Sequence, residues 1–190
     1  MSKSGEPVRV EVRRRSRTFE AEAVCQVQAA AATVWETITD YPALSTFMPG
    51  IRACRVVERN PAGRSGERLL VEQEGEFRFM LFAQPLKLQL EIEHEARRLA
   101  VARALSFDLG VLKGRALERF EGRYELLPGP ARGPVSLRYA ALIVSRLPPP
   151  PGIGTVAVRH NLEAQLRAVV DECERRAAAP GRQRAVAGAR

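Results

Sequence analysis

The chain has 190 residues, 45% hydrophobic and 27% charged, which suits one globular domain, and no apolar run approaches the roughly 20 residues of a membrane span. The net charge of +8 lies at the ends, since residues 1–17 carry six basic and two acidic groups and residues 175–190 carry five basic groups and no acidic one. We therefore expect a nearly neutral domain over 18–178 between a flexible basic tail over 1–17 and a disordered basic tail over 179–190.

The domain is predicted to begin with a strand and a helix. FEAEAVCQVQ, over residues 19–28, largely alternates apolar and polar residues, as a half-buried strand does. Over residues 29–40 the apolar residues recur at spacings of three and four, which predicts a helix. The turn-forming Asp40-Tyr41-Pro42 ends this helix, and residues 44–48 are expected to form a second short turn before Pro49-Gly50.

Seven further strands are predicted after Gly50, separated by short clusters of Gly, Pro, Asn or charged residues. The breaks are too short for helical crossovers, so we expect antiparallel connections and exclude a parallel βαβ architecture. The expected strands are 51–58, 67–74, 76–82, 86–95, 99–107, 115–126 and 134–145.

A long helix is predicted at the C-terminal end of the domain. LPPPPGIG, over residues 147–154, must start as an extended connector, because proline lacks an amide hydrogen and fixes φ. From residue 155 to about 178 the apolar residues again recur at three and four, and such a helix needs a large apolar surface to lie on. We therefore predict an α+β fold: a curved antiparallel sheet of about seven or eight strands around the last helix, with two short helices after the first strand.

This order of elements resembles the START-like (SRPBCC) superfamily. Within it, VWETITDYPALSTFMPGI, over residues 34–51, and FEGRYEL, over 120–126, resemble the polyketide cyclase/dehydrase and coenzyme Q-binding group, which also includes the ribosome-association toxin. The resemblance covers roughly residues 18–178. It implies a helix-grip fold with a hydrophobic cavity between the sheet and the last helix, in which lipids, quinones, polyketides or other apolar molecules bind. Fold alone does not fix the ligand or the chemistry.

Candidate ligand residues follow from the resemblance and from the phase of each element. In the family the helical corner closes one side of the cavity, so Leu44, Phe47 and Met48 are candidates for a lid or wall, although they would only pack if they face the sheet edge. Alternate residues of a strand line one face, and the apolar residues of the last helix face the sheet. The strand and helix candidates are Phe77, Phe79, Leu81, Leu88, Arg103, Leu105, Phe107, Tyr124, Tyr139, Val158, Leu162 and Leu166.

The polar members of this set each have two readings. Arg103 falls in the apolar phase of its strand, where it would need an acidic partner or an anionic or carbonyl-bearing ligand. A bulge or bend would instead turn Arg103 out to solvent. Tyr124 and Tyr139 each offer a ring for packing and a hydroxyl for orienting a ligand oxygen, and core tyrosines with satisfied hydroxyls are the alternative.

Neither a metal site nor a cofactor is expected. The two histidines, His94 and His160, have no cysteine or second histidine at motif spacing, and the three cysteines are widely spaced without a CxxC. GIGTVA, over residues 152–157, matches a dinucleotide fingerprint, but the chain ends in the helix that follows, without the next strand of a Rossmann unit. The cysteine usage and the lack of an apolar signal segment fit the cytoplasm.

Three functions remain open at this point. The favoured one is binding or carriage of one small hydrophobic molecule in the cavity. The second is an aromatase/cyclase acting on a polyketide, which needs a polar cluster inside the cavity. The third is a ribosome- or RNA-associated protein that uses the basic tails, which could also touch an anionic membrane surface.

Overall fold

The computed structural model describes residues 8–63, 66–79, 82–108, 117–129, 133–146 and 153–179. Eight strands form one antiparallel sheet in the order β1-β2-β8-β7-β6-β5-β4-β3. The strands are β1 (Glu11–Arg15), β2 (Thr18–Val27), β3 (Ile51–Ala62), β4 (Gly66–Phe79), β5 (Phe82–Glu95), β6 (Leu99–Asp108), β7 (Leu117–Leu126) and β8 (Val135–Ser145).

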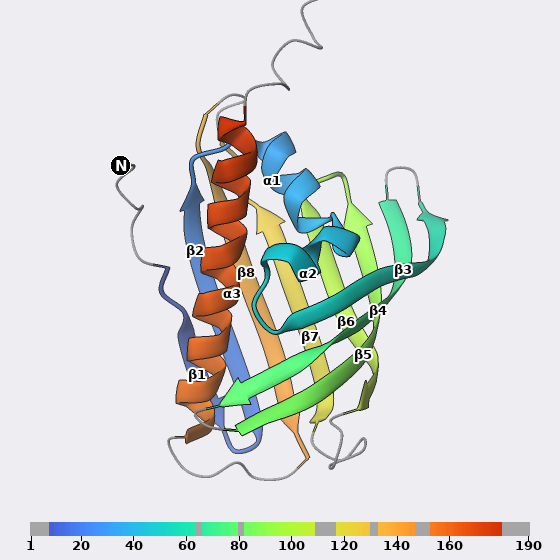
Figure 1. Ribbon diagram of the computed structural model, residues 1–190, viewed down its shortest axis with the longest axis vertical. Helices are drawn as coiled ribbons and strands as arrows, with labels where there is room; N and C mark the ends of the chain where they lie inside the picture. The colour runs from blue at the N-terminus through green and yellow to red at the C-terminus, as the bar shows by residue number, and fades with distance from the viewer. Residues whose placement is uncertain are drawn as a thin grey trace, which may run out of the picture.

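The helices lie on one face of the sheet (Figure 1). They are α1 (Ala31–Ile38), the 3-10 turn η1 (Tyr41–Ala43), α2 (Leu44–Phe47) and α3 (Ile153–Ala178). Helix α3 packs against β1, β2, β4 and α1, and the sheet curves around the helices, with β3 next to α2 (Figure 1). The predicted α+β architecture, a curved antiparallel sheet around a long last helix, is confirmed.

Strand periodicity explains which face is buried. Along β2, Phe19, Ala21, Ala23, Cys25 and Val27 are all buried, and the residues between them are exposed. The same alternation on the other strands gives the sheet one apolar face, which the helices cover.

The core consists of two apolar clusters that meet along α3. One joins β1, β2 and β8 to the first half of α3, through Val158, Leu162 and Leu166. The other joins β4, β5 and β6 to α1, α2 and the second half of α3, through Val169 and Cys173. Helix α3 therefore bridges both halves of the sheet.

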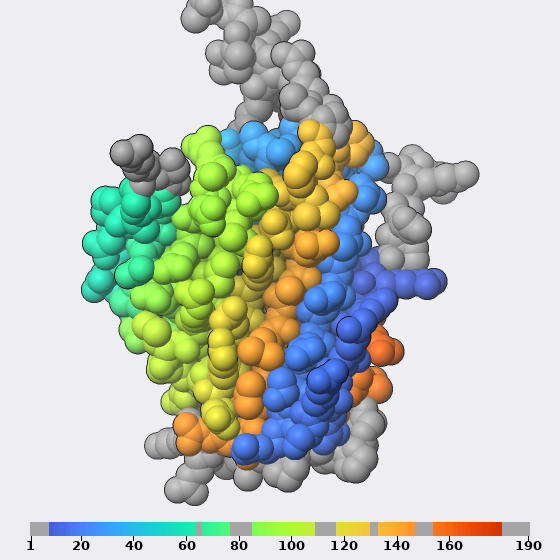
Figure 2. All heavy atoms as spheres, turned by 180° about the vertical axis from the view of Figure 1, so that it is seen from behind, coloured from blue at the N-terminus to red at the C-terminus, as the bar shows by residue number. Residues whose placement is uncertain are grey.

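The outer face of the sheet is charged and is seen from behind in Figure 2, where the strands lie side by side and no described helix covers them. Arginines on this face pair with glutamates of neighbouring strands. Examples are Arg55 with Glu72 at 3.0 Å and Arg68 with Glu93 at 2.9 Å. Such cross-strand pairs balance the charge, so the described outer face is not the unbalanced basic surface expected for RNA binding.

Two boundaries differ from the sequence prediction. Residues 11–15, assigned above to a flexible basic tail, form β1, because Val12 and Arg14 pair with Ala21 and Phe19 on the helix-bearing face of β2. The predicted strands 67–74 and 76–82 are not two separate strands. Gly75 and Glu76 continue β4 to Phe79, and Phe82 already belongs to β5. Eight strands were predicted and eight are observed, but β1 was not among those predicted, and the predicted strand 76–82 is divided between β4 and β5.

Candidate functional site

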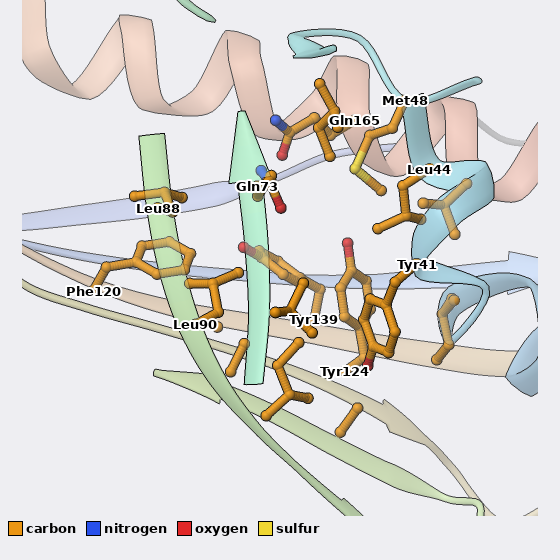
Figure 3. Close-up of a pocket in the computed structure, with 18 residues that line it drawn as sticks. Tyr41, Leu44, Met48, Gln73, Leu88, Leu90, Phe120, Tyr124, Tyr139 and Gln165 are labelled. Atoms are coloured by element: carbon orange, nitrogen blue, oxygen red, sulfur yellow. The ribbon is translucent and has the colours of Figure 1, made fainter. Parts of the chain in front are cut away.

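A cavity of about 120 Å³ lies between the sheet, the corner formed by η1 and α2, and α3 (Figure 3). Its wall is formed mainly by apolar side chains from β4 to β8 and from the corner. The lining residues are Ile38, Tyr41, Leu44, Met48, Ile51, Val71, Gln73, Leu88, Leu90, Ile92, Ala100, Ala102, Phe120, Gly122, Tyr124, Tyr139, Gln165 and Val169.

Small residues on two neighbouring strands leave this space open. Ala100 and Ala102 of β6 and Gly122 of β7 lie in the wall, and Ala102 pairs directly with Gly122. A Cβ atom built on Gly122 would lie 3.4 Å from the Phe120 ring and 3.7 Å from the Tyr139 hydroxyl, which is ordinary contact distance. Larger side chains at these positions would therefore reduce the cavity.

Four polar side chains interrupt the apolar wall. The rings of Tyr124 and Tyr139, from β7 and β8, lie with centroids 4.8 Å apart, and their hydroxyls point to the side where Gln73 and Gln165 lie (Figure 3). Burial raises the pKa of both phenols above the usual value, so both stay protonated and neutral. Within the described residues, none of the four groups has a hydrogen-bond partner.

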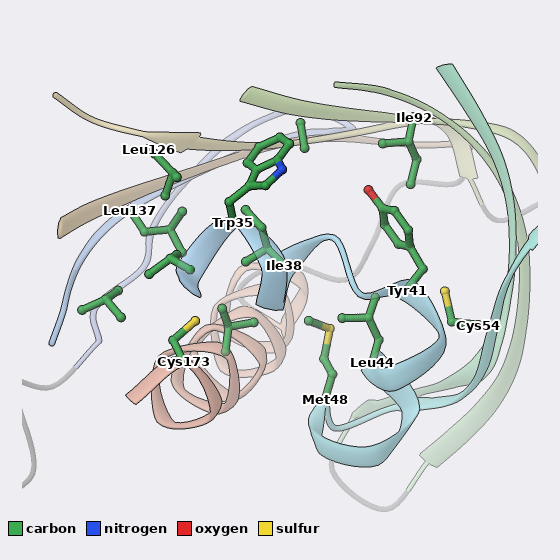
Figure 4. Packing of buried hydrophobic residues seen from close by; sticks show 14 of the residues in the cluster. Trp35, Ile38, Tyr41, Leu44, Met48, Cys54, Ile92, Leu126, Leu137 and Cys173 are labelled. Atoms are coloured by element: carbon green, nitrogen blue, oxygen red, sulfur yellow. The ribbon is translucent and has the colours of Figure 1, made fainter. Parts of the chain in front are cut away.

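The helical corner supplies the wall opposite the sheet (Figure 4). Tyr41, Leu44 and Met48 are all buried and line the cavity. Pro42 stands in the first turn of η1, where its fixed φ suits a helix start. Gly50 ends the corner at φ 83°, and a Cβ there would lie 2.9 Å from the Glu76 carbonyl oxygen, so the exit into β3 requires glycine.

An ion-pair group joins the corner to α3. The Arg176 guanidinium donates to the Asp40 carboxylate at 3.0 Å and to Glu172 at 2.7 Å. It also lies 5.9 Å from the centre of the Phe47 ring, a cation-π distance. Hydrogen bonds from Arg175 and Arg176 lower the pKa of Glu172 to about 2. The residue directly before η1 and the end of α2 are therefore both held to the last helix.

A hydrogen-bonded chain runs from the cavity wall to Glu67, a partly exposed residue near the start of β4. The Tyr41 hydroxyl lies 2.6 Å from Nε2 of His94, and Nδ1 of His94 lies 3.4 Å from the Glu67 carboxylate. Burial lowers the pKa of His94, although Glu67 opposes this effect, so the ring is neutral near pH 7. A proton on Nδ1 satisfies both contacts, because Nδ1 then donates to Glu67 while Nε2 accepts the Tyr41 hydroxyl.

The predicted ligand residues divide into three sets. Leu44, Met48, Leu88, Tyr124 and Tyr139 line the cavity. Val158, Leu162 and Leu166 instead pack in the core against β1, β2 and β8, and Phe47 faces Arg176. Leu81 and the side chains of Phe77 and Phe79 lie outside the described residues.

The strand phase predicted for β6 is wrong. Arg103 points outward, where it pairs with Glu93 at 3.3 Å and Glu121 at 3.5 Å, and Leu105 is 57% exposed. Alanines take the inward positions of this strand, and a bulge leaves Leu105 unpaired opposite β5. Beyond that bulge Phe107 pairs with Leu88, and both border a second groove, but of the two Leu88 alone also lines the cavity.

Sequence reasoning missed Gln73, Gln165 and the small residues of the wall. A signal was available, because Gln73 shares the phase of Leu69 and Val71, and Gln165 stands three residues after Leu162 and four before Val169. A polar residue inside an apolar stripe marks either a hydrogen-bonded core position or a site.

Among the described residues, no group of His, Cys, Asp and Glu side chains could hold a metal ion. No helix in the described part of the chain is long and apolar enough to span a membrane.

Comparison with known proteins places this geometry in a family. The model of the family described as polyketide cyclase/dehydrase and lipid transport matches residues 18–178. No curated protein sequence matches the chain significantly. Many solved structures do match, and three of the most similar are the following.

A START superfamily protein from Mycobacterium smegmatis aligns with a TM-score of 0.67 and 17% identity, covering 82% of this chain and 97% of that one. The aromatase/cyclase Zhui from Streptomyces aligns with a TM-score of 0.65 and 18% identity, covering 86% and 98%. A STAR-related lipid transfer protein from Xanthomonas axonopodis aligns with 0.62 and 20%, covering 90% and 96%. At these identities the structures show a shared fold. The chain therefore belongs to the polyketide cyclase/dehydrase and lipid transport family.

Proposed function

We propose that the protein binds one small hydrophobic molecule in the cavity between the sheet, the helical corner and α3. The observation that carries this proposal is an apolar cavity kept open by Ala100, Ala102 and Gly122. Protein cores are normally close-packed, and an unfilled volume costs about 24 cal/mol per Å³. At that rate 120 Å³ costs about 3 kcal/mol, which is a large fraction of the stability of an ordinary domain.

The size of the cavity limits what fits without movement. An engineered cavity of about 150 Å³ accepts benzene, whereas pockets for larger ligands run from about 300 Å³ upward. The 120 Å³ cavity therefore suits a single ring. A lipid, quinone or polyketide-like molecule of several rings would require the corner of η1 and α2 to move away from the sheet.

Native mass spectrometry of protein purified from its own host, before and after organic extraction, tests the proposal. We expect a bound apolar molecule that extraction removes. The matched variant Ala102→Leu, which fills the cavity, should purify without that molecule, while Ala140→Leu on the outer face should retain it. Wild-type protein that carries no extractable molecule, and also fails to take up a one-ring apolar probe, would contradict the proposal.

A second candidate is an aromatase/cyclase, and the chain from Glu67 through His94 to Tyr41 is the observation that favours it. The Tyr41 ring lines the cavity, and its hydroxyl is bonded to a neutral imidazole that could accept a proton. The test is incubation with a reactive poly-β-ketone and analysis of the cyclised products. Catalysis predicts a product distribution that differs from the spontaneous one and reverts to it in Tyr41→Phe. An unchanged distribution with the wild-type protein would rule this candidate out.

A further inference from the structure

We infer that the cavity selects a neutral ring compound that carries carbonyl or hydroxyl oxygens, and that it excludes carboxylates and other anions. This inference rests on the proposed function and adds the chemical class of the ligand. Its basis is the set of four polar side chains in the wall, Gln73, Tyr124, Tyr139 and Gln165. They come from β4, β7, β8 and α3, so the fold brings them together from distant parts of the sequence.

The four polar side chains of the wall form no hydrogen bond within the described part of the protein. Tyr139 is only 5% exposed, and in the described part of the chain no residue bonds to its hydroxyl or to the other three groups. No fully enclosed side-chain nitrogen or oxygen of the described residues lacks a hydrogen-bond partner, so these four groups are open to the cavity space, where water or a ligand can reach them. The hydroxyls point into the cavity towards the side with both glutamines (Figure 3). An occupant with oxygen atoms would satisfy groups that the protein leaves without partners.

The described cavity wall offers no cation to an anionic ligand. The described lining of the cavity contains no Lys, Arg or His. Two cations near the cavity are engaged elsewhere: Arg176 is bonded to Asp40 and Glu172, and Lys87, which borders a groove together with the cavity residues Gln73 and Leu88, is bonded to Glu74 at 2.8 Å. His94 is bonded to Tyr41 behind the wall, and its burial favours the neutral ring. A carboxylate in this cavity would lose its hydration without gaining a cation.

The aromatic rings of the wall favour a flat ligand. Phe120, Tyr124, Tyr139 and Tyr41 present aromatic rings to the same small space. Aromatic rings prefer offset or edge-to-face contacts with other rings, so the wall suits a flat occupant better than a flexible acyl chain. The tyrosine hydroxyls and glutamine amides can donate to a carbonyl oxygen, and each can also accept from a hydroxyl.

Three probes of matched shape test the inference: isopropylbenzene without oxygen, acetophenone with a neutral carbonyl, and benzoate with a carboxylate. All have the same number of non-hydrogen atoms. Their dissociation constants are measured by NMR titration of the wild-type protein, of Tyr139→Phe and Gln73→Leu, and of the control Gln26→Leu on the outer face. We expect each cavity variant to weaken acetophenone roughly 2- to 10-fold, the effect of one lost hydrogen bond. Isopropylbenzene should bind the variants as tightly as the wild type or more tightly.

Benzoate should bind the wild type at least about tenfold more weakly than acetophenone, and Gln26→Leu should change none of the three constants. Equal weakening of acetophenone and isopropylbenzene by the cavity variants would overturn the inference, as would benzoate binding as tightly as acetophenone. Both results leave the proposed function standing, because isopropylbenzene still binds. The proposed function itself fails if isopropylbenzene does not bind the wild-type protein at all and the protein purified from its host carries no extractable molecule.

Discussion

Arg176 of α3 donates a hydrogen bond of 3.0 Å to Asp40, although 136 residues separate them in the chain. Asp40 stands directly before η1, whose Tyr41 lines the cavity. The ion pair therefore fixes the corner that closes the cavity against the helix behind it, and any ligand larger than one ring must work against this contact.

Replacing Arg176 should both destabilise the protein and loosen the corner. Arg176→Met removes hydrogen bonds to two carboxylates and leaves Glu172, only 9% exposed, with Arg175 alone. We expect the free energy of unfolding to fall by about 2 kcal/mol in urea denaturation. We also expect faster association of acetophenone, measured by NMR exchange. The control is Arg159→Met on an exposed position of α3. If both variants have the same free energy of unfolding and the same association rate, the ion pair does not fix the corner to α3.

Filling the cavity should abolish binding without unfolding the protein. In Ala102→Leu the larger side chain enters a space of about 120 Å³, so the lost void offsets the strain of the added atoms. The free energy of unfolding should stay within about 1 kcal/mol of wild type, while isopropylbenzene binding disappears from the NMR titration. The same change on the outer face, Ala140→Leu, should leave binding intact. Retained binding in Ala102→Leu would place the ligand elsewhere.

Leu166 belongs to the core and not to the cavity wall, so its replacement distinguishes an effect on stability from an effect on binding. It is 1% exposed and packs in the cluster of β1, β2 and β8 without lining the cavity. Leu166→Ala should therefore cost about 3 kcal/mol of stability and leave the acetophenone dissociation constant unchanged. Leu105→Ala, at a position 57% exposed, should cost less than about 0.5 kcal/mol. A large loss of affinity in folded Leu166→Ala would mean that this part of α3 contacts the ligand after all.

The buried His94 predicts a loss of stability in mild acid. Its pKa is lowered in the folded protein, so the unfolded chain binds the proton more tightly, and stability is fully present above the unfolded value of 6.5. It should decline as the pH falls through 6.5 towards the lower folded pKa, by at most about 1.4 kcal/mol per pH unit. Glu67 and Arg59 are the charged groups that act on the ring.

Urea denaturation at a series of pH values checks this decline, and His94→Gln should flatten it. Glu172 titrates in a separate window, since its pKa is lowered from 4.5 to about 2, and the stability that it contributes is lost only as the pH falls below 4.5. An identical slope for wild type and His94→Gln between pH 7 and 5 would contradict the role assigned to the imidazole.

Most of the fold could be predicted from the sequence because each element carries a regular period. The strict alternation of β2 and the spacing of three and four in α3 both reflect one buried face. The β1 strand was missed although Val8, Val10 and Val12 alternate with charged residues, a period of two. Within EVRRR itself Val12 is the one apolar residue, and the pairing of β1 depends on the edge that β2 offers.

The site was less predictable, because the residues that make room are small. The rule that large apolar residues face inward assigned Leu105 to the cavity, and Arg103 with it because the two share a strand phase. In the structure Arg103 points outward, and Ala100 and Ala102 line the cavity. A cavity wall needs small side chains that leave space as well as apolar ones. Hydrophobicity alone therefore assigned the wrong face of β6 to the cavity. The predicted pair Phe47 and Met48 illustrates the same limit, since only the packing decides that Met48 faces the cavity and Phe47 faces Arg176.

Met48 provides the most direct test of binding in this cavity. The sequence has three methionines, and within the described part of the chain Met48 is the one that lines the cavity, so its ε-methyl group can be labelled with ¹³C and assigned with Met48→Leu. On titration with isopropylbenzene we expect the Met48 methyl signal to shift through the ring current of the bound probe, and Ala102→Leu to show no shift. Binding detected by calorimetry without any change in the Met48 signal, or no binding by either method, would contradict the account.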